Sequence, residues 1–114
     1  MSIGEQADSN PESTASQLEV TWDPNKAQSN LTKHGVAFAQ AASVLLDALA
    51  LTVYDEAHSD LEERWFTLGI SGEGKLLAVS HTYSATGPNS MKARIISARE
   101  PTKAERRQYE NEAR

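Results

Sequence analysis

The sequence contains no cysteine among its 114 residues. Disulfides, thiolate metal sites, iron–sulfur clusters and a cysteine nucleophile are therefore excluded. A chain without cysteine fits a reducing compartment, and we expect it to reside in the cytoplasm. Long hydrophobic runs are also missing, since no segment reaches the roughly 18 consecutive apolar residues of a membrane span. Residues 1–17 contain no Lys or Arg and no apolar run, unlike a secretory signal.

Basic residues are outnumbered. The chain has 11 Lys and Arg against 16 Asp and Glu, a net charge of -5. This balance argues against a protein that wraps nucleic acid by bulk charge. The distribution is more informative, because residues 88–114 carry seven bases and only four acids. A basic final quarter favours a surface that faces a polyanion, and the alternative is a solvated helix with Glu/Arg pairs.

The length fits one domain, and the chain divides into two parts. Residues 1–17 are rich in Ser, Gln, Asn and Glu and have little to bury, so we expect an acidic, polar and disordered tail. Residues 18–114 form the domain. It starts with a strand, Leu18–Trp22, in which apolar and polar residues alternate.

Two helices are predicted after this strand. Asp23 is a good N-cap residue, Pro24 suits the first helical position, and Gly35 is a typical C-terminal stop. The second helix is predicted from an apolar stripe at helical spacing, which comprises Phe38, Ala41, Ala42, Leu45 and Leu46.

From about residue 50 the hydrophobic period changes to two. Short strands are predicted around 51–53, 66–70, 76–83 and 94–97, with an acidic loop at 55–63, a tight turn at 72–74 and a looser turn at 84–90. Thr102 and Glu105 match a capping box that opens a final basic helix. The order predicts an α+β fold: an antiparallel sheet meander with two N-terminal helices and one C-terminal helix, packed on one face.

Signatures of metal and cofactor enzymes are missing. The three histidines, His34, His58 and His81, lack close ligand spacing, and His58 lies in what is more simply an exposed acidic loop. The sequence has neither a P-loop nor a dinucleotide-binding glycine motif. We therefore expect no metal and no cofactor.

A set of basic and protic side chains remains. It comprises Lys33, His34, Arg64, Arg94, Arg99, Arg106 and Tyr109, with Glu63 beside Arg64. RNA cleavage without a metal requires such groups: a base for the ribose 2′-OH, a cation for the charge on the phosphorane, and an acid for the leaving 5′ oxygen. Arginine suits the second task because its guanidinium matches phosphate oxygens. Surface salt bridges are the alternative explanation for most of these residues.

Several motifs resemble the BrnT family of toxins, in the family's order and over about residues 18–110. They are Trp22-Asp23-Pro24-Asn25-Lys26, Asn30, Lys33-His34-Gly35-Val36 with Phe38 and Ala41, Glu63-Arg64, Gly69, Leu76–Val79, Ile95–Arg99, and Glu105-Arg106 with Tyr109. The Lys-His-Gly-Val and Ile-Ser-Ala-Arg elements at this separation are specific in combination.

The resemblance implies a fold similar to RelE-type toxins and a metal-independent endoribonuclease of a type II toxin–antitoxin system that stops translation. It also implies a BrnA-like ribbon-helix-helix antitoxin as partner, in a heterotetramer that contacts operator DNA through the antitoxin. The alternative is a catalytically weakened or inactive homologue that still binds its antitoxin.

The resemblance also implies roles for individual residues. Arg64, Arg94 and Arg99 are expected to contact phosphate and stabilise charge. Lys33 and His34 are expected to act as acid, base or RNA contact, and Glu63 to join them or to orient Arg64. Lys26, Trp22, Arg106 and Tyr109 are the expected RNA-binding residues. For His34, Trp22 and Tyr109 a structural role at a helix end or in the core is the alternative.

Two features complicate this assignment. Arg94 and Arg99 are five residues apart and would point to opposite faces of a regular strand, so a shared site requires the strand to end or bulge near Ser97. Many family members carry an Arg near the position of Thr82, where this chain has Tyr83 and Ser84. Loss of a phosphate-stabilising donor costs about 2.7–4 kcal/mol in other enzymes, so catalysis could be weakened.

Overall fold

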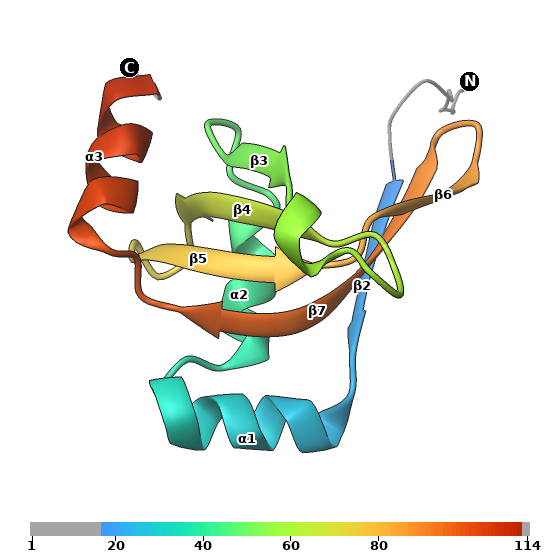
Figure 1. Ribbon diagram of the computed structural model, residues 1–114, viewed down its shortest axis with the longest axis horizontal. Coiled ribbons are helices and arrows are strands. Elements are labelled where there is room, and N and C mark those ends of the chain that lie inside the picture. The colour runs from blue at the N-terminus through green and yellow to red at the C-terminus, as the bar shows by residue number, and fades with distance from the viewer. Residues whose placement is uncertain (1–16, 113–114) are drawn as a thin grey trace, which may run out of the picture.

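The computed structural model describes residues 17–112. In chain order (Figure 1), the elements are β2 (Gln17–Trp22), α1 (Pro24–His34), α2 (Phe38–Val44), β3 (Leu51–Tyr54), the 3₁₀-helix η2 (Glu56–His58), β4 (Trp65–Ile70), β5 (Leu76–His81), β6 (Ser84–Gly87), β7 (Ser90–Arg99) and α3 (Lys103–Glu112). The predicted tail lies outside the described residues except for Gln17, which begins β2 opposite Ser90.

The sheet is mixed, with the order β2-β7-β5-β4-β3 and with β6 paired to β7 off this path. Strands β3, β4, β5 and β7 pair antiparallel, whereas β2 pairs in parallel with β7. The predicted α+β class is confirmed, but the prediction of a wholly antiparallel meander is wrong. Two parallel strands need a long connection between them, and here most of the domain separates β2 from β7.

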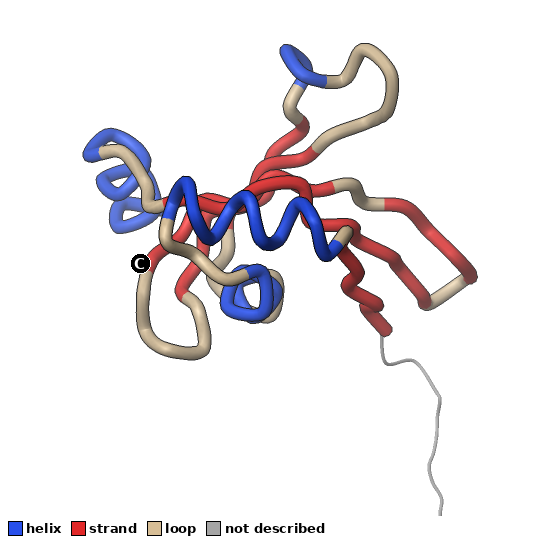
Figure 2. Tube along the Cα trace, turned by 90° about the horizontal axis from the view of Figure 1, so that it is seen from below, coloured by secondary structure: helices blue, strands red, loops and turns tan. Residues whose placement is uncertain are grey.

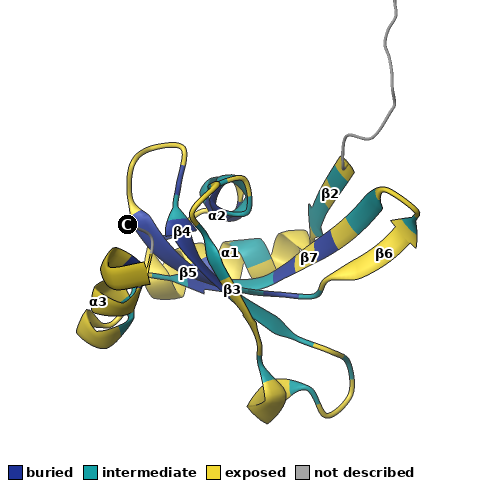
Figure 3. Cartoon of the chain, turned by 90° about the horizontal axis from the view of Figure 1, so that it is seen from above, coloured by how far each residue is buried: buried dark blue, intermediate teal, exposed yellow. Residues whose placement is uncertain are grey.

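Two hydrophobic cores lie on opposite faces of the sheet. On one face, α2 packs on alternate residues of β5 and β7, and the cluster comprises Val36, Phe38, Ala41, Val44, Leu77, Val79, Ile95 and Ala98. On the other face, Tyr109 of α3 packs against Leu68, Leu76 and Ala78. Adjacent residues of β5 point to opposite faces, so the expectation that all helices cover one face is wrong. Buried positions gather in β4, β5, β7 and α2 (Figure 3).

Local capping signals place α1 and α3 as predicted. The Asp23 carboxylate accepts from Asn25 N at 2.8 Å, and Gly35 ends α1 with φ 71°. At α3, Thr102 N donates to Glu105 Oε1 at 2.9 Å, and Glu105 N donates to Thr102 Oγ1 at 3.1 Å, which confirms the capping box. No helix in residues 17–112 is long and apolar enough to cross a membrane.

Two local predictions are wrong. The second helix ends at Val44, and Leu46, expected on its apolar stripe, is 75% exposed. Residues 84–90, expected as a loose turn, form β6 and a hairpin to β7. Three of the four β6 residues are exposed (Figure 3), so this strand has no buried face. Its sequence therefore lacks the alternation of apolar and polar residues by which a strand is predicted. The segment between β3 and β4, which includes η2, projects away from the sheet (Figure 2).

Candidate functional site

An irregularity in β7 brings Arg94 and Arg99 to the same face of the sheet. In the pairing with β5, Ser97 lies opposite Ser80 while Ile95 lies opposite His81, so Ile96 is an extra residue. A bulge of this kind shifts the alternation of side chains by one position. Both arginines therefore lie on the face opposite α2, as a site shared by them requires.

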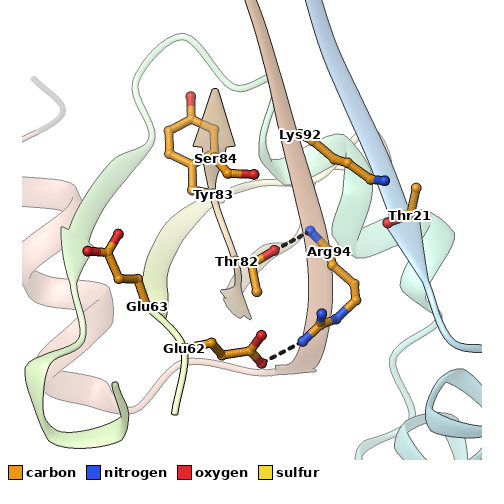
Figure 4. Close-up of a pocket in the computed structure, with 8 residues that line it drawn as sticks. All are labelled: Thr21, Glu62, Glu63, Thr82, Tyr83, Ser84, Lys92 and Arg94. Carbon is orange, nitrogen blue, oxygen red and sulfur yellow. Dashed lines mark hydrogen bonds and ion pairs between the residues drawn. The ribbon is translucent and has the colours of Figure 1, made fainter. Parts of the chain in front are cut away.

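Arg94 borders a cavity of about 460 Å³ between β2, β7 and the segment after β5 (Figure 4). Its lining residues are Thr21, Glu62, Glu63, Thr82, Tyr83, Ser84, Lys92 and Arg94. Arg94 Nη2 lies 2.6 Å from Glu62 Oε1, and both side chains are more than a third exposed. The cavity thus combines two cations with two carboxylates and four hydroxyls. The guanidinium of Arg94 is already paired with one of these carboxylates, that of Glu62.

A second cavity, of about 300 Å³, lies where α1 passes β7, and we name it the α1–β7 pocket. Its lining residues are Lys26, Ser29, Asn30, Lys33, His34, Ile96 and Ser97. The lining contains three basic side chains and no carboxylate. Within residues 17–112, none of the three forms an ion pair. Ile96 and Ser97 belong to the bulge, so the pocket borders β7 between Arg94 and Arg99.

Arg99 is held by α3. Its guanidinium makes two hydrogen bonds to Glu105, at 2.8 and 3.1 Å, and its Cζ lies 5.6 Å from the centroid of the Phe66 ring. The bond to Glu105, with its charge, raises the pKa of Arg99 despite partial burial. The bond to Arg99 lowers the pKa of Glu105, against the effect of its own burial. Arg99 is therefore a fixed cation at the α3 side of this face.

The structure does not unite Glu63 and Arg64. Glu63 lines the Arg94 cavity, whereas Arg64 lines a separate cavity of about 300 Å³ beside η2, with Leu61 and Glu62. In the described part of the chain no ion pair joins Glu63 to Arg64, so geometry gives no support to an orienting role for Glu63. Glu62, between the two cavities, was not singled out by the sequence.

The predicted RNA-binding residues lie in different places. Lys26 joins the α1–β7 pocket. Trp22 packs edge to face on Phe38, with ring centroids 6.2 Å apart, and is 36% exposed. Tyr109 is buried in the second core and donates to Asp47 Oδ2 at 2.6 Å, while Arg106 is exposed on α3. A role in packing thus explains the placement of Tyr109 and most of the contacts of Trp22.

The described residues include no group of three or more His, Cys, Asp and Glu side chains that could hold a metal ion. The sequence analysis assigned no role to Asn30, Lys92 or Ser97, which line the two cavities. Asn30 had one available signal. In the sequence it is a polar residue that shares a helical face with Ala27 and Leu31. In the structure it is only 6% exposed.

Comparison with known proteins assigns the family. Residues 22–105 match the family described as "Ribonuclease toxin, BrnT, of type II toxin-antitoxin system". The chain also resembles the crystal structure of the ribonuclease toxin BrnT of Brucella abortus, with 24% identity and a TM-score of 0.52 over 76% of this chain and 100% of that one. A comparison with curated proteins finds no match. The family match covers most of the domain and includes α1, the β7 bulge and the start of α3, and the chain therefore belongs to the BrnT family of ribonuclease toxins.

Proposed function

We propose that this protein cleaves RNA without a metal ion at the α1–β7 pocket, with the arginines of β7 assisting. One observation carries the proposal: the pocket gathers Lys26, Lys33 and His34 with no lining carboxylate. A cavity whose basic side chains form no ion pairs attracts phosphate by its positive potential, whereas carboxylates paired with those side chains would lower this potential. The pocket also adjoins the strand segment between Arg94 and Arg99, the two residues expected to stabilise charge.

The chemistry requires no group beyond these. The ribose 2′ oxygen bonds to phosphorus after losing its proton to a base, and the 5′ oxygen leaves and takes a proton from an acid. An imidazole is the side chain best suited to exchange a proton at physiological pH, which favours His34 for one of these steps. Lys33 then stabilises the charge on the phosphorane oxygens, while Arg94 and Arg99, outside the pocket on the face opposite α2, would bind other phosphates of the same RNA where it passes β7.

The partner follows from the family, since a type II toxin is neutralised by a protein antitoxin. We propose a BrnA-like ribbon-helix-helix antitoxin in a heterotetramer, with translation in the cytoplasm as the process inhibited by the free toxin. The RelE-type relationship of the fold is part of the same proposal. Co-purification of the toxin with such an antitoxin and loss of cleavage in the complex would support this arrangement.

Cleavage of RNA by the purified protein in EDTA tests the catalytic proposal. Lys33→Met removes one pocket cation at similar length, and Lys75→Met is the matched control, because Lys75 lies outside the pocket and only pairs loosely with Glu100 at 3.8 Å. We expect the first change to slow cleavage by roughly 100- to 1,000-fold, the scale of one lost charge-stabilising group, and the second to leave it unchanged. Cleavage that needs a divalent ion, or equal rates for both variants, would overturn the proposal.

A weakened toxin is the second candidate, and the arginines favour it. Internal carboxylates engage both Arg94 and Arg99. Tyr83 also lies near the position where many family members carry an Arg. On this alternative the protein binds its antitoxin tightly but does not arrest growth when expressed alone. Growth arrest on expression, abolished by Lys33→Met, would rule this candidate out.

A further inference from the structure

His81 is a buried histidine to which the proposed chemistry gives no role. It is 1% exposed, and both ring nitrogens are bonded: Nδ1 lies 2.8 Å from Thr82 O, and Nε2 lies 2.7 Å from Thr67 Oγ1. A carbonyl can only accept, so Nδ1 carries the proton and donates to Thr82. In the neutral ring, Nε2 then accepts from the Thr67 hydroxyl.

The residue after His81 holds the backbone of Arg94. Thr82 N donates to Arg94 O at 2.9 Å. Arg94 N donates to Thr82 Oγ1 at 2.9 Å, as Figure 4 shows. The carbonyl of Thr82 is the group that His81 binds. Three polar groups of Thr82 are thus engaged, two by Arg94 and one by His81, so a shift of Thr82 moves Arg94 with it.

This contact occurs where the sheet is irregular. The register between β5 and β7 shifts between Ser80 and His81, at the bulge that brings Arg94 and Arg99 to one face. A bulge disrupts the regular ladder of backbone hydrogen bonds, and a side chain can supply the missing constraint. We infer that His81 is a positioning residue that fixes Arg94 through Thr82. The inference rests on the proposed function, in which Arg94 binds a phosphate of the RNA.

Thr67 satisfies the second nitrogen of the His81 ring but does not set its tautomer, which the Thr82 carbonyl already fixes. Thr67 Oγ1 lies 2.8 Å from Thr52 Oγ1 on the edge strand β3, so the hydroxyl of Thr67 can accept from Thr52 while it donates to His81. Burial lowers the pKa of His81, although the bond to Thr82 acts in the opposite direction. A neutral ring with its proton on Nδ1 is the form that binds Thr67 and Thr82 together.

Two substitutions at one site separate the contacts. Asn places an amide nitrogen near the position of Nδ1, and Gln places its amide near Nε2. We expect His81→Asn to keep kcat for RNA cleavage within about twofold. We expect His81→Gln to lower kcat by roughly 10- to 100-fold, the scale of a small misplacement of a catalytic group. Thr67→Val is the control, since it removes the other partner of His81 and should cost stability without changing kcat.

Hydrogen exchange supplies a readout that needs no RNA. The amides of Thr82 and Arg94 should exchange faster in His81→Gln than in the wild type or in His81→Asn, at a pH where all remain folded. Equal protection in both variants, or equal loss of kcat in both and in Thr67→Val, would show that His81 is only part of the core. Wild-type protein that fails to cleave RNA while these exchange differences persist would overturn the proposed function but not the contact. If His81→Gln does not fold, Thr82→Val tests the second step of the inference, because it removes the acceptor of Arg94 N and should lower kcat while Thr67→Val does not. An unchanged kcat in Thr82→Val would overturn the inference, since Thr82 would then not position Arg94.

Discussion

Asn30 and Ala98 lie 68 residues apart in the chain and are joined by two hydrogen bonds. Asn30 Nδ2 donates to Ala98 O at 2.9 Å, and Ala98 N donates to Asn30 Oδ1 at 3.0 Å. The side-chain amide of Asn30 pairs with the backbone of Ala98 as a residue of a neighbouring strand would. It does so beyond the end of β2, because β2 pairs with β7 only as far as Ile95. It thereby holds α1, which carries Lys33 and His34, against the bulge of β7.

Asn30→Ala should destabilise the protein by about 2–4 kcal/mol, because buried groups at Val36 and Ala98 lose their partners. Asn30→Asp should be at least as harmful, since a carboxylate oxygen would replace the Nδ2 that donates to two carbonyls. Urea unfolding monitored by circular dichroism measures both, with Gln28→Ala on the exposed side of α1 as the control. A loss below about 0.5 kcal/mol for Asn30→Ala, the range of ordinary surface changes, would contradict this view of α1.

The pair Tyr109–Asp47 predicts a response to alkaline pH. Burial, together with the bond to Asp47 and its charge, raises the pKa of Tyr109 to about 12. A raised pKa means that the stabilisation is complete below pH 10.0 and is lost as the pH rises through about 12. Tyr109→Phe should cost about 1.5–3 kcal/mol at pH 7, the value of a hydrogen bond to a charged group. The difference between the two proteins in urea unfolding should shrink from pH 10 to pH 12, and a difference independent of pH would show that the hydroxyl contributes little.

Glu105 predicts the opposite dependence, at acid pH. Its bond to Arg99 lowers its pKa from the ordinary 4.5, with help from Thr102 and against the effect of burial. A lowered pKa means that the stabilisation is complete above pH 4.5 and is lost as the pH falls through the lowered value. Glu105→Gln should cost only about 1 kcal/mol at pH 7, since Arg99 is partly exposed and solvent screens the pair. Thermal unfolding followed from pH 7 downwards should show a gap between the proteins that narrows once the pH falls below 4.5. A gap that persists would assign the effect to packing.

The local parts of this fold could be predicted from the sequence. Asp23 with Pro24, and Thr102 with Glu105, define the starts of α1 and α3 through contacts within three residues, so no knowledge of the rest of the chain is needed. The exposed strand β6 and the early end of α2 depend instead on what packs against them. The parallel placement of β2 is set by contacts with Ser90–Ile95, which lie some 70 residues further along the chain.

The candidate site divides in the same way. Lys33 and His34 lie about two helical turns from Lys26, so a helix prediction alone puts them on one side of α1, and the structure gathers them in one pocket. Arg94 and Arg99 meet on one face only because Ile96 is an extra residue in the pairing with β5. No residue in that stretch is a glycine or another sequence marker of a bulge, so the sequence could raise the question but not answer it. Glu62 was missed because its importance depends on a partner 32 residues away.

Glu62 is the residue whose removal should most directly change how Arg94 meets RNA. Its Oε1 lies 2.6 Å from Arg94 Nη2. A phosphate oxygen that binds this guanidinium must therefore compete with the carboxylate of Glu62. Glu62→Gln removes the competing charge, so we expect KM for RNA to fall by roughly 1.5- to 5-fold, the size of an exposed ion pair, with little change in stability. Glu56→Gln in η2 is the matched control, because it removes the same charge from the same segment outside the Arg94 cavity. The effect of Glu62→Gln should disappear in an Arg94→Met background, which separates a local release of the guanidinium from a general change in surface charge. If Glu62→Gln instead lowers kcat, Glu62 takes part in proton transfer or holds Arg94 in its productive position, and the idea that it masks Arg94 is wrong.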